Sequence, residues 1–121
     1  MRMLHTSDWH LGRQFHNVSL LEDQRHVLEQ IIAIVRERAV EVVLVAGDIY
    51  DRSVPPAEAV QLLDEVVHRL SAECGVPLIL IAGNHDGAER LGFGARQLAR
   101  AGVHISGPLG QQPEPVILQD V

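Results

Sequence analysis

Three short polar clusters in the sequence have the residue types of a metal-dependent active site. Carboxylate, imidazole and amide ligands together suit Mn²⁺ or Fe²⁺, and Zn²⁺ also accepts them. Two such cations about 4 Å apart would activate water and stabilise an in-line attack on phosphorus. The clusters are residues 7–12, 47–51 and 83–86, and their candidate site residues are Asp8, His10, Asp48, Asn84 and His85. The sequence therefore predicts one shared two-metal centre.

The spacing within the clusters suggests a role for each candidate. Asp8 and His10 stand two residues apart, so an extended backbone would send both side chains to the same side, where they could hold one cation. The two oxygens of Asp48 could bridge two cations, and the carbonyl of Asn84 offers a further ligand. His85 could meet the substrate instead of a metal. These residue types also shape ordinary turns, but the repetition of the pattern after three apolar runs favours a common site.

Four further residues are secondary candidates. Asp51 and Asp86 could orient the metal ligands through hydrogen bonds, and they could equally shape turns or cap helices. Arg13 could hold a phosphate group near the first cluster, and His16 could contact substrate. For both, a solvated surface position is the alternative.

Short apolar runs directly precede the three clusters. Runs of aliphatic residues without alternation are typical of strands that are covered on both faces, as in a parallel sheet. The pattern predicts strands at 2–6, 42–46, 78–82, 103–105 and 116–118, and helices at 20–38, 55–73 and 92–101. The fold class is therefore α/β with a mainly parallel sheet flanked by helices. In such a sheet, ligands bind beyond the carboxyl ends of the strands, where the clusters lie.

Composition excludes several classes of protein. With 121 residues, of which 46% are apolar, the chain suits one folded domain. The net charge is −6, which argues against a protein that coats DNA by neutralising phosphates. No apolar run approaches the roughly 20 residues that span a bilayer, and the first residues do not resemble a signal peptide. One cysteine excludes an internal disulfide and a thiolate metal cluster. We expect a cytoplasmic protein without a membrane partner.

The combined motifs resemble those of the calcineurin-like metallophosphoesterases. Residues 5–12, 45–51 and 81–86, with Pro55 and Pro56 heading a helix, are similar in particular to bacterial SbcD-type exonuclease subunits. The resemblance covers about residues 1–107. It implies the N-terminal half of an α/β/β/α sandwich. It also implies that Asp8 and His10 hold a first metal, Asp48 bridges both, Asn84 holds the second, and His85 assists catalysis.

The resemblance also implies a function. The cofactor would be two Mn²⁺ ions, with Mg²⁺, Fe²⁺ or Zn²⁺ as alternatives. The substrate would be DNA, degraded exonucleolytically from duplex ends and cut endonucleolytically in single strands or hairpins, during repair, recombination and replication. The partners would be an SbcC-type ATPase and a second nuclease subunit, and the protein would act at the nucleoid.

The sequence departs from the family pattern in one respect, and two alternative functions stay open. Family members complete the site with a further His and a late Gly-His-x-His motif, which residues 1–121 do not include. We therefore expect this chain to be an N-terminal portion of a nuclease domain. A phosphomonoesterase or cyclic-nucleotide phosphodiesterase of the same superfamily is one alternative, and a non-catalytic interaction fragment is another.

Overall fold

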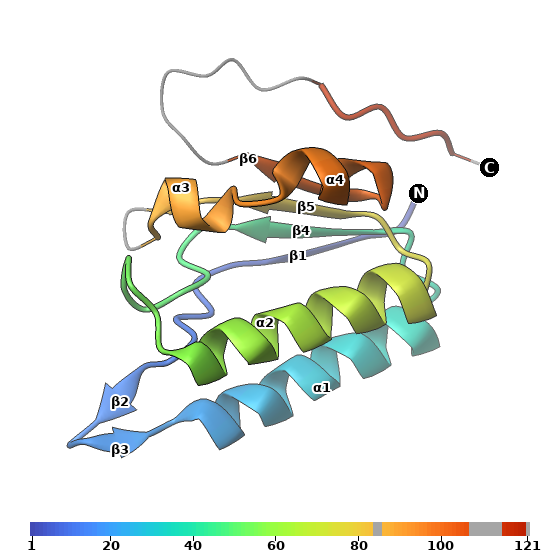
Figure 1. Ribbon diagram of the computed structural model, residues 1–121. Helices are drawn as coiled ribbons and strands as arrows, with labels where there is room; N and C mark the ends of the chain where they lie inside the picture. Colours follow the sequence, from blue (N-terminus) through green and yellow to red (C-terminus); the bar gives the residue numbers. More distant parts are fainter. Residues whose placement is uncertain (84–85, 107–114, 121) are drawn as a thin grey trace.

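The computed structural model is an α/β fold in which parallel strands alternate with helices (Figure 1). It describes residues 1–83, 86–106 and 115–120. The strands are β1 (Met3–Thr6), β2 (Gln14–Phe15), β3 (Val18–Ser19), β4 (Val42–Ala46), β5 (Leu78–Ile81) and β6 (Val103–Ser106). The helices are α1 (Leu21–Glu37), α2 (Ala57–His68), the π-helical turn η1 (Arg69–Glu73), α3 (Ala88–Leu91) and α4 (Ala95–Arg100).

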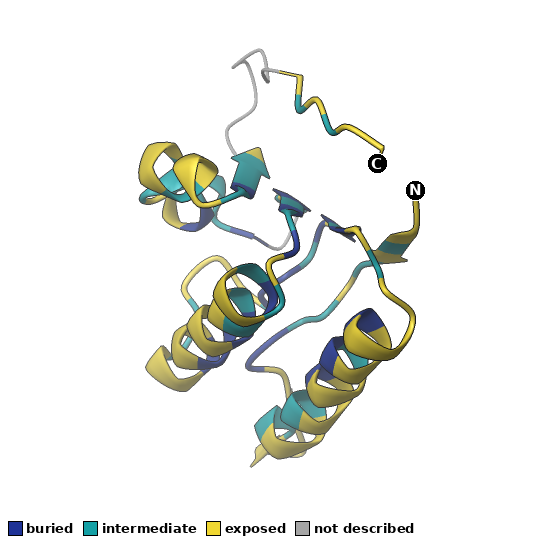
Figure 2. Cartoon of the chain, turned by 90° about the vertical axis from the view of Figure 1, so that its right-hand side faces the viewer, coloured by how far each residue is buried: buried dark blue, intermediate teal, exposed yellow. Residues whose placement is uncertain are grey.

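Four strands form a parallel sheet in the order β1-β4-β5-β6. Each strand pairs with the preceding strand of this sheet, so right-handed crossovers place the connecting helices on the same face. Figures 1 and 2 show α1 and α2 side by side along that face. The predicted α/β fold with a mainly parallel, helix-flanked sheet is confirmed.

The core lies between the sheet and these two helices. Residues spaced by three and four put one stripe of each helix against the strands. The buried residues of this layer include Leu28, Ile32 and Val35 of α1, Leu62, Leu63 and Val66 of α2, and Val43, Val45, Leu78 and Leu80 of the sheet. Each fully buried aliphatic side chain contributes about 1.5–3 kcal/mol to folding. This layer therefore fixes the strands whose ends carry the polar clusters.

The other face of the sheet is less covered. Neighbouring residues of a strand point to opposite faces, and most residues that alternate with the core strand residues are more exposed, although Val42 at the start of β4 is buried. Met3 of β1 is 63% exposed and Ile81 of β5 is 50% exposed, while Leu44 and Ile79 are half-buried. Figure 2 shows this face turned away from α1 and α2.

Two predicted elements differ in the structure. The predicted helix 92–101 is shorter in the structure, because α4 (Ala95–Arg100) begins only after Gly94, which takes a left-handed conformation (φ 76°). The short helix α3 (Ala88–Leu91) lies before the predicted bounds and was not predicted. The predicted strand 116–118 is wrong: residues 115–120 have no regular secondary structure.

A small antiparallel hairpin, β2–β3, precedes α1 and was not predicted. Its two turn residues, His16 and Asn17, both have positive φ (50° and 62°), as the tight turns of two-residue hairpin loops require. Among the residues described, no helix combines the length and the apolar character needed to cross a membrane.

A candidate metal centre at the carboxyl end of the sheet

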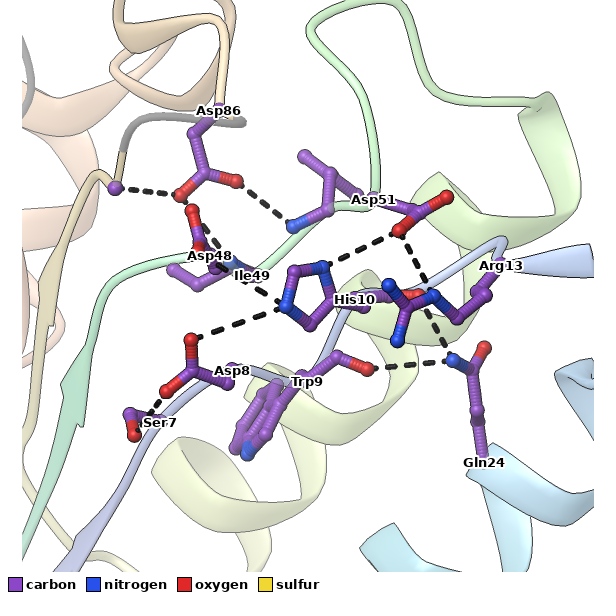
Figure 3. A network of polar contacts seen from close by, with 12 residues as sticks. Ser7, Asp8, Trp9, His10, Arg13, Gln24, Asp48, Ile49, Asp51 and Asp86 are labelled. Atoms are coloured by element: carbon purple, nitrogen blue, oxygen red, sulfur yellow. Dashed lines mark hydrogen bonds and ion pairs between the residues drawn. The ribbon is translucent and has the colours of Figure 1, made fainter.

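Three of the predicted ligands converge beyond the ends of β1 and β4 (Figure 3). One ligand atom each from Asp8, His10 and Asp48 lies within 4.8 Å of the others. The Nε2 atom of His10 is 3.8 Å from Oδ1 of Asp8 and 3.9 Å from Oδ2 of Asp48. The other two predicted members, Asn84 and His85, lie outside the described residues.

All three converging residues have a left-handed backbone. The φ angles are 56° at Asp8, 48° at His10 and 48° at Asp48. The expected extended backbone between Asp8 and His10 is therefore wrong, although their side chains do meet. A left-handed conformation costs roughly 1–2 kcal/mol at a residue with a Cβ. Such strain persists where the surroundings hold it, and it concentrates at functional sites.

Backbone hydrogen bonds hold the first two loops together beyond the sheet. They run from the N–H groups of Asp8, His10 and Leu11 to the carbonyls of Gly47, Asp48 and Ile49, at 3.0, 2.9 and 2.9 Å, and from the N–H of Asp51 to Leu11 at 3.1 Å. A parallel bridge between Leu11 and Tyr50 continues this pairing. The two loops therefore continue the β1–β4 pairing beyond the strands. This pairing fixes the position of the loop with Asp8 and His10 relative to the loop with Asp48.

The loop after β5 leaves room for Asp48 at Gly83. A Cβ atom at Gly83 would overlap both the backbone nitrogen and a carboxylate oxygen of Asp48. Gly47 faces the same point, since its Cβ would lie 3.2 Å from the Cα of Gly83. The close approach of these two loops thus depends on glycine.

Substituting Gly83→Ala should displace Asp48 and weaken Mn²⁺ binding. Overpacking of this kind costs about 1–3 kcal/mol of folding stability. Calorimetric titration with Mn²⁺ and thermal unfolding would measure both effects. Gly75→Ala is the matched control, because that site has positive φ and, among the described residues, no atom lies within 4 Å of the added Cβ. Wild-type Mn²⁺ affinity in the folded Gly83→Ala variant would refute the steric role.

Asp86 joins the second and third loops. It is 9% exposed, and its carboxylate accepts hydrogen bonds from the backbone N–H groups of Ile49 (3.1 Å), Tyr50 (2.8 Å) and Gly83 (2.8 Å). Two of these donors directly follow Asp48 in the second loop, and the third, Gly83, lies against Asp48 from the third loop. Of the two interpretations of Asp86, this arrangement favours a residue that orients the ligand loop.

Asp51 contacts the imidazole of His10 on the side away from the other two carboxylates. Its Oδ1 lies 3.2 Å from Nδ1 of His10 and 3.4 Å from Nε of Arg13. Asp51 and Arg13 are thus placed beside the cluster, as Figure 3 shows. His16 lies in the β2–β3 turn, where its ring contacts Phe15 at 4.3 Å between centroids. No contact that would join His16 to the cluster is seen among the described residues.

Two residues of this network were not predicted from the sequence. The hydroxyl of Ser7 donates to Oδ2 of Asp8 at 2.7 Å. Gln24 of α1 hydrogen bonds to the backbone of the first loop. A signal for Gln24 existed, since it lies four residues before buried Leu28, on the apolar stripe of the helix. A polar side chain on that stripe needs partners.

The donor set fits a divalent cation. Asp8 and Asp48 supply carboxylate oxygens, and His10 supplies a ring nitrogen, which is a combination that Mn²⁺, Fe²⁺ and Zn²⁺ accept. The carboxylate of Asp51 adds negative charge to the cluster, and the guanidinium of Arg13 offsets part of it. Neighbouring carboxylates repel each other, and a cation between them would remove that repulsion.

Tyr50, between the second loop and the core, should titrate late. Burial, and then the charges of Asp86 and Asp64, raise the pKa of Tyr50 to about 12. Tyr50 is the single tyrosine, so tyrosinate absorbance of the metal-free chain reports this group alone. The folded pKa lies above the ordinary value of 10.0, so this contribution to stability is complete below pH 10 and is lost as pH rises toward 12. A midpoint near 10 in the folded chain would contradict the burial of this side chain.

Comparison with known proteins gives one family match and close relatives. The calcineurin-like phosphoesterase family model matches residues 1–113. The chain is 40% identical over 121 residues to the D subunit of the nuclease SbcCD of Staphylococcus saprophyticus, covering 100% of this chain and 32% of that protein. It is 38% identical to the protein of the same name from Staphylococcus epidermidis, with the same coverage of 100% and 32%. The chain thus spans about a third of the length of these relatives.

Proposed function

Since this chain belongs to the calcineurin-like phosphoesterase family, we propose that it is part of a metal-dependent phosphodiesterase that cleaves DNA. The observation that carries the proposal is the convergence of Asp8, His10 and Asp48 within 4.8 Å. Three ligand-type residues held in strained backbone conformations at one point are typical of a functional site. The strain in their backbones is the energetic cost that a preformed binding site is expected to carry.

Each residue of the cluster has a proposed role. Asp8 and His10 would hold a first cation, Asp48 would be a ligand shared with a second, and Asn84 would be a further ligand of the second. When bound, the two Mn²⁺ ions would lower the pKa of a water molecule and offset charge on the phosphate. His10 turns Nδ1 toward Asp51, so a proton on Nδ1 leaves the lone pair of Nε2 directed at the carboxylates.

Three residues would act on the substrate instead of the metal. His85 would stabilise the transition state or assist the leaving group. The side chain of Arg13 is 56% exposed and lies beside Asp51, from where its guanidinium can reach a phosphate oxygen of a bound strand. His16 is a further substrate contact in this proposal.

The names of the two relatives support the proposal that the substrate is a nucleic acid and that the partner is an SbcC-type subunit. Both are named as the D subunit of a nuclease, SbcCD. We extend this to the present chain: exonuclease action on duplex ends, endonuclease action on hairpins and single strands, an SbcC-type ATPase partner and a nuclease homodimer. The setting would be DNA repair and recombination in the cytoplasm, at the nucleoid.

The less covered face of the sheet supports the proposal that this chain is part of a larger domain. A face with exposed Met3 and Ile81 and half-buried Leu44 and Ile79 leaves apolar area in water. Residues 1–121 would be the N-terminal portion of a nuclease domain, and the second sheet of a sandwich would cover this face.

Comparing two substrates tests the function. The protein with Mn²⁺ is assayed on hairpin DNA and on a small phosphate monoester, each with and without a chelator. We expect chelator-sensitive cleavage of the hairpin. Hydrolysis of the monoester alone would instead assign a phosphomonoesterase, and no hydrolysis together with no Mn²⁺ binding would assign a non-catalytic fragment.

A further inference from the structure

Gln24 in the first turn of α1 makes three hydrogen bonds to one short loop. Figure 3 shows the two that its amide nitrogen donates. Its Nε2 donates to the carbonyl of Trp9 at 3.3 Å and to the carbonyl of His10 at 2.8 Å. Its Oε1 accepts from the N–H of Gly12 at 3.1 Å. These partners lie on both sides of the strained ligand His10 and include its own carbonyl.

The side-chain amide suits this arrangement chemically. It carries two donors and an acceptor at one end of the side chain, and Gln24 uses both kinds toward neighbouring backbone groups. With His10 at φ 48°, the peptide group before His10 is turned differently from that of an extended residue, so the carbonyls of Trp9 and His10 have a different relative orientation. The amide of Gln24 bonds to both carbonyls in this orientation, so it stabilises the left-handed form over the extended one.

The helix gives this contact a firm support. Gln24 stands one turn before Leu28, and Leu28 and Ile32 are 2% and 1% exposed in the core. The position of Gln24 is therefore set by the packing of α1 on the sheet. The side chain of Gln24 therefore connects the core to the first loop, whose backbone also pairs with the second loop.

We propose that Gln24 is a positioning residue of the metal centre, which holds His10 and Asp8 in the conformation that binds the cation. The inference rests on the proposed function, because it assigns Gln24 a role toward the metal ligands. Gln24 touches neither metal nor substrate in this role. It acts through the backbone of residues 9–12.

The substitution Gln24→Glu tests the proposal with little change in shape. A carboxylate oxygen replaces the donating Nε2 and faces two carbonyl oxygens, while the bond from Gly12 can remain. Groups that orient metal ligands typically contribute about 10- to 100-fold to metal affinity. Calorimetric titration of the 121-residue chain with Mn²⁺ should show a loss of that size.

Two further variants distinguish a positioning role of Gln24 from a general effect of changing the charge or a side chain of α1. Gln30→Glu makes the same chemical change on the same helix, where Gln30 is exposed and its side chain contacts the His26 ring at 3.4 Å. It should leave Mn²⁺ affinity unchanged. Gln24→Met removes all three hydrogen bonds without adding charge, and it should weaken binding in the same way as Gln24→Glu.

Unfolding and amide exchange complete the test. If Gln24 only stabilised the fold, its substitution would lower the apparent Mn²⁺ affinity only in proportion to the fraction of molecules that unfold. Thermal unfolding of the metal-free variant measures that fraction. We expect a larger loss, together with faster hydrogen exchange at the amides of residues 10–12. Wild-type affinity in folded Gln24 variants, an equal loss in Gln30→Glu, or failure of both Gln24 variants to fold would overturn the positioning role. Absence of Mn²⁺ binding to the wild-type chain would overturn the metal centre as well.

Discussion

Replacing Asp48 by alanine should abolish the stabilisation that Mn²⁺ gives to this chain. Asp48 is the central carboxylate of the cluster, its side chain is 14% exposed, and its Oδ2 lies 3.9 Å from Nε2 of His10. A ligand at a hundred times its dissociation constant stabilises a fold by about 2.7 kcal/mol. For a domain of this size, that raises the melting temperature by roughly 10 °C. The Asp48→Ala variant should show almost none of this rise.

The measurement is thermal unfolding with increasing Mn²⁺. Asp64→Ala is the matched control, since Asp64 is an exposed carboxylate of α2 outside the cluster. Its melting temperature should rise with Mn²⁺ as the wild type's does. An equal rise in Asp48→Ala would show that Mn²⁺ binds elsewhere, and the proposed centre would have to be abandoned.

Replacing Asp86 by asparagine should destabilise the fold strongly, although the two side chains have nearly the same shape. The carboxylate accepts three backbone N–H groups in a nearly buried position. An asparagine amide would turn an N–H₂ group toward at least one of these donors, which would leave it unpaired. An unpaired buried donor costs about 1–3 kcal/mol, and bonds to a charged acceptor are worth about 1.5–3 kcal/mol each. The expected loss is therefore about 3 kcal/mol or more.

Urea unfolding of the metal-free chain would measure this loss. An exposed substitution such as Asp64→Asn should change stability by no more than about 0.5 kcal/mol. Because Asp86 joins the loop that carries Asp48 to the third loop, the variant should also bind Mn²⁺ more weakly. A stability equal to the wild type would mean that the three hydrogen bonds are not formed in solution.

The sequence was sufficient to predict the sheet because its signals are local. The runs at 42–46 and 78–82 are aliphatic without alternation, and they became β4 and β5 within one residue of the predicted bounds. The stripe of Leu28, Ile32 and Val35 predicted α1 in the same way. Polar residues placed directly after such strands must lie at one edge of a parallel sheet, so the meeting of Asp8 with Asp48 was also predictable.

The details of the site were not predictable, because tertiary contacts decide them. No local propensity favours a left-handed histidine, and His10 adopts this conformation where Gln24 and the second loop bond to its backbone. The role of Asp86 depends on donors 36 and 37 residues away in the chain. Gly94 lies inside a single predicted helix, although its missing Cβ allows the break between α3 and α4.

The order of strands in the sheet has a consequence for how the protein is made. Spatial order follows chain order from β1 to β4, β5 and β6, so each new strand adds to an edge that already exists. Synthesis proceeds from the N-terminus, and early segments can begin to fold before later ones emerge from the ribosome. Asp8, His10 and Asp48 can therefore come together once β4 has left the exit tunnel, long before translation is finished. A nascent chain would therefore acquire the first two of its three cation-binding loops before the third, which follows β5.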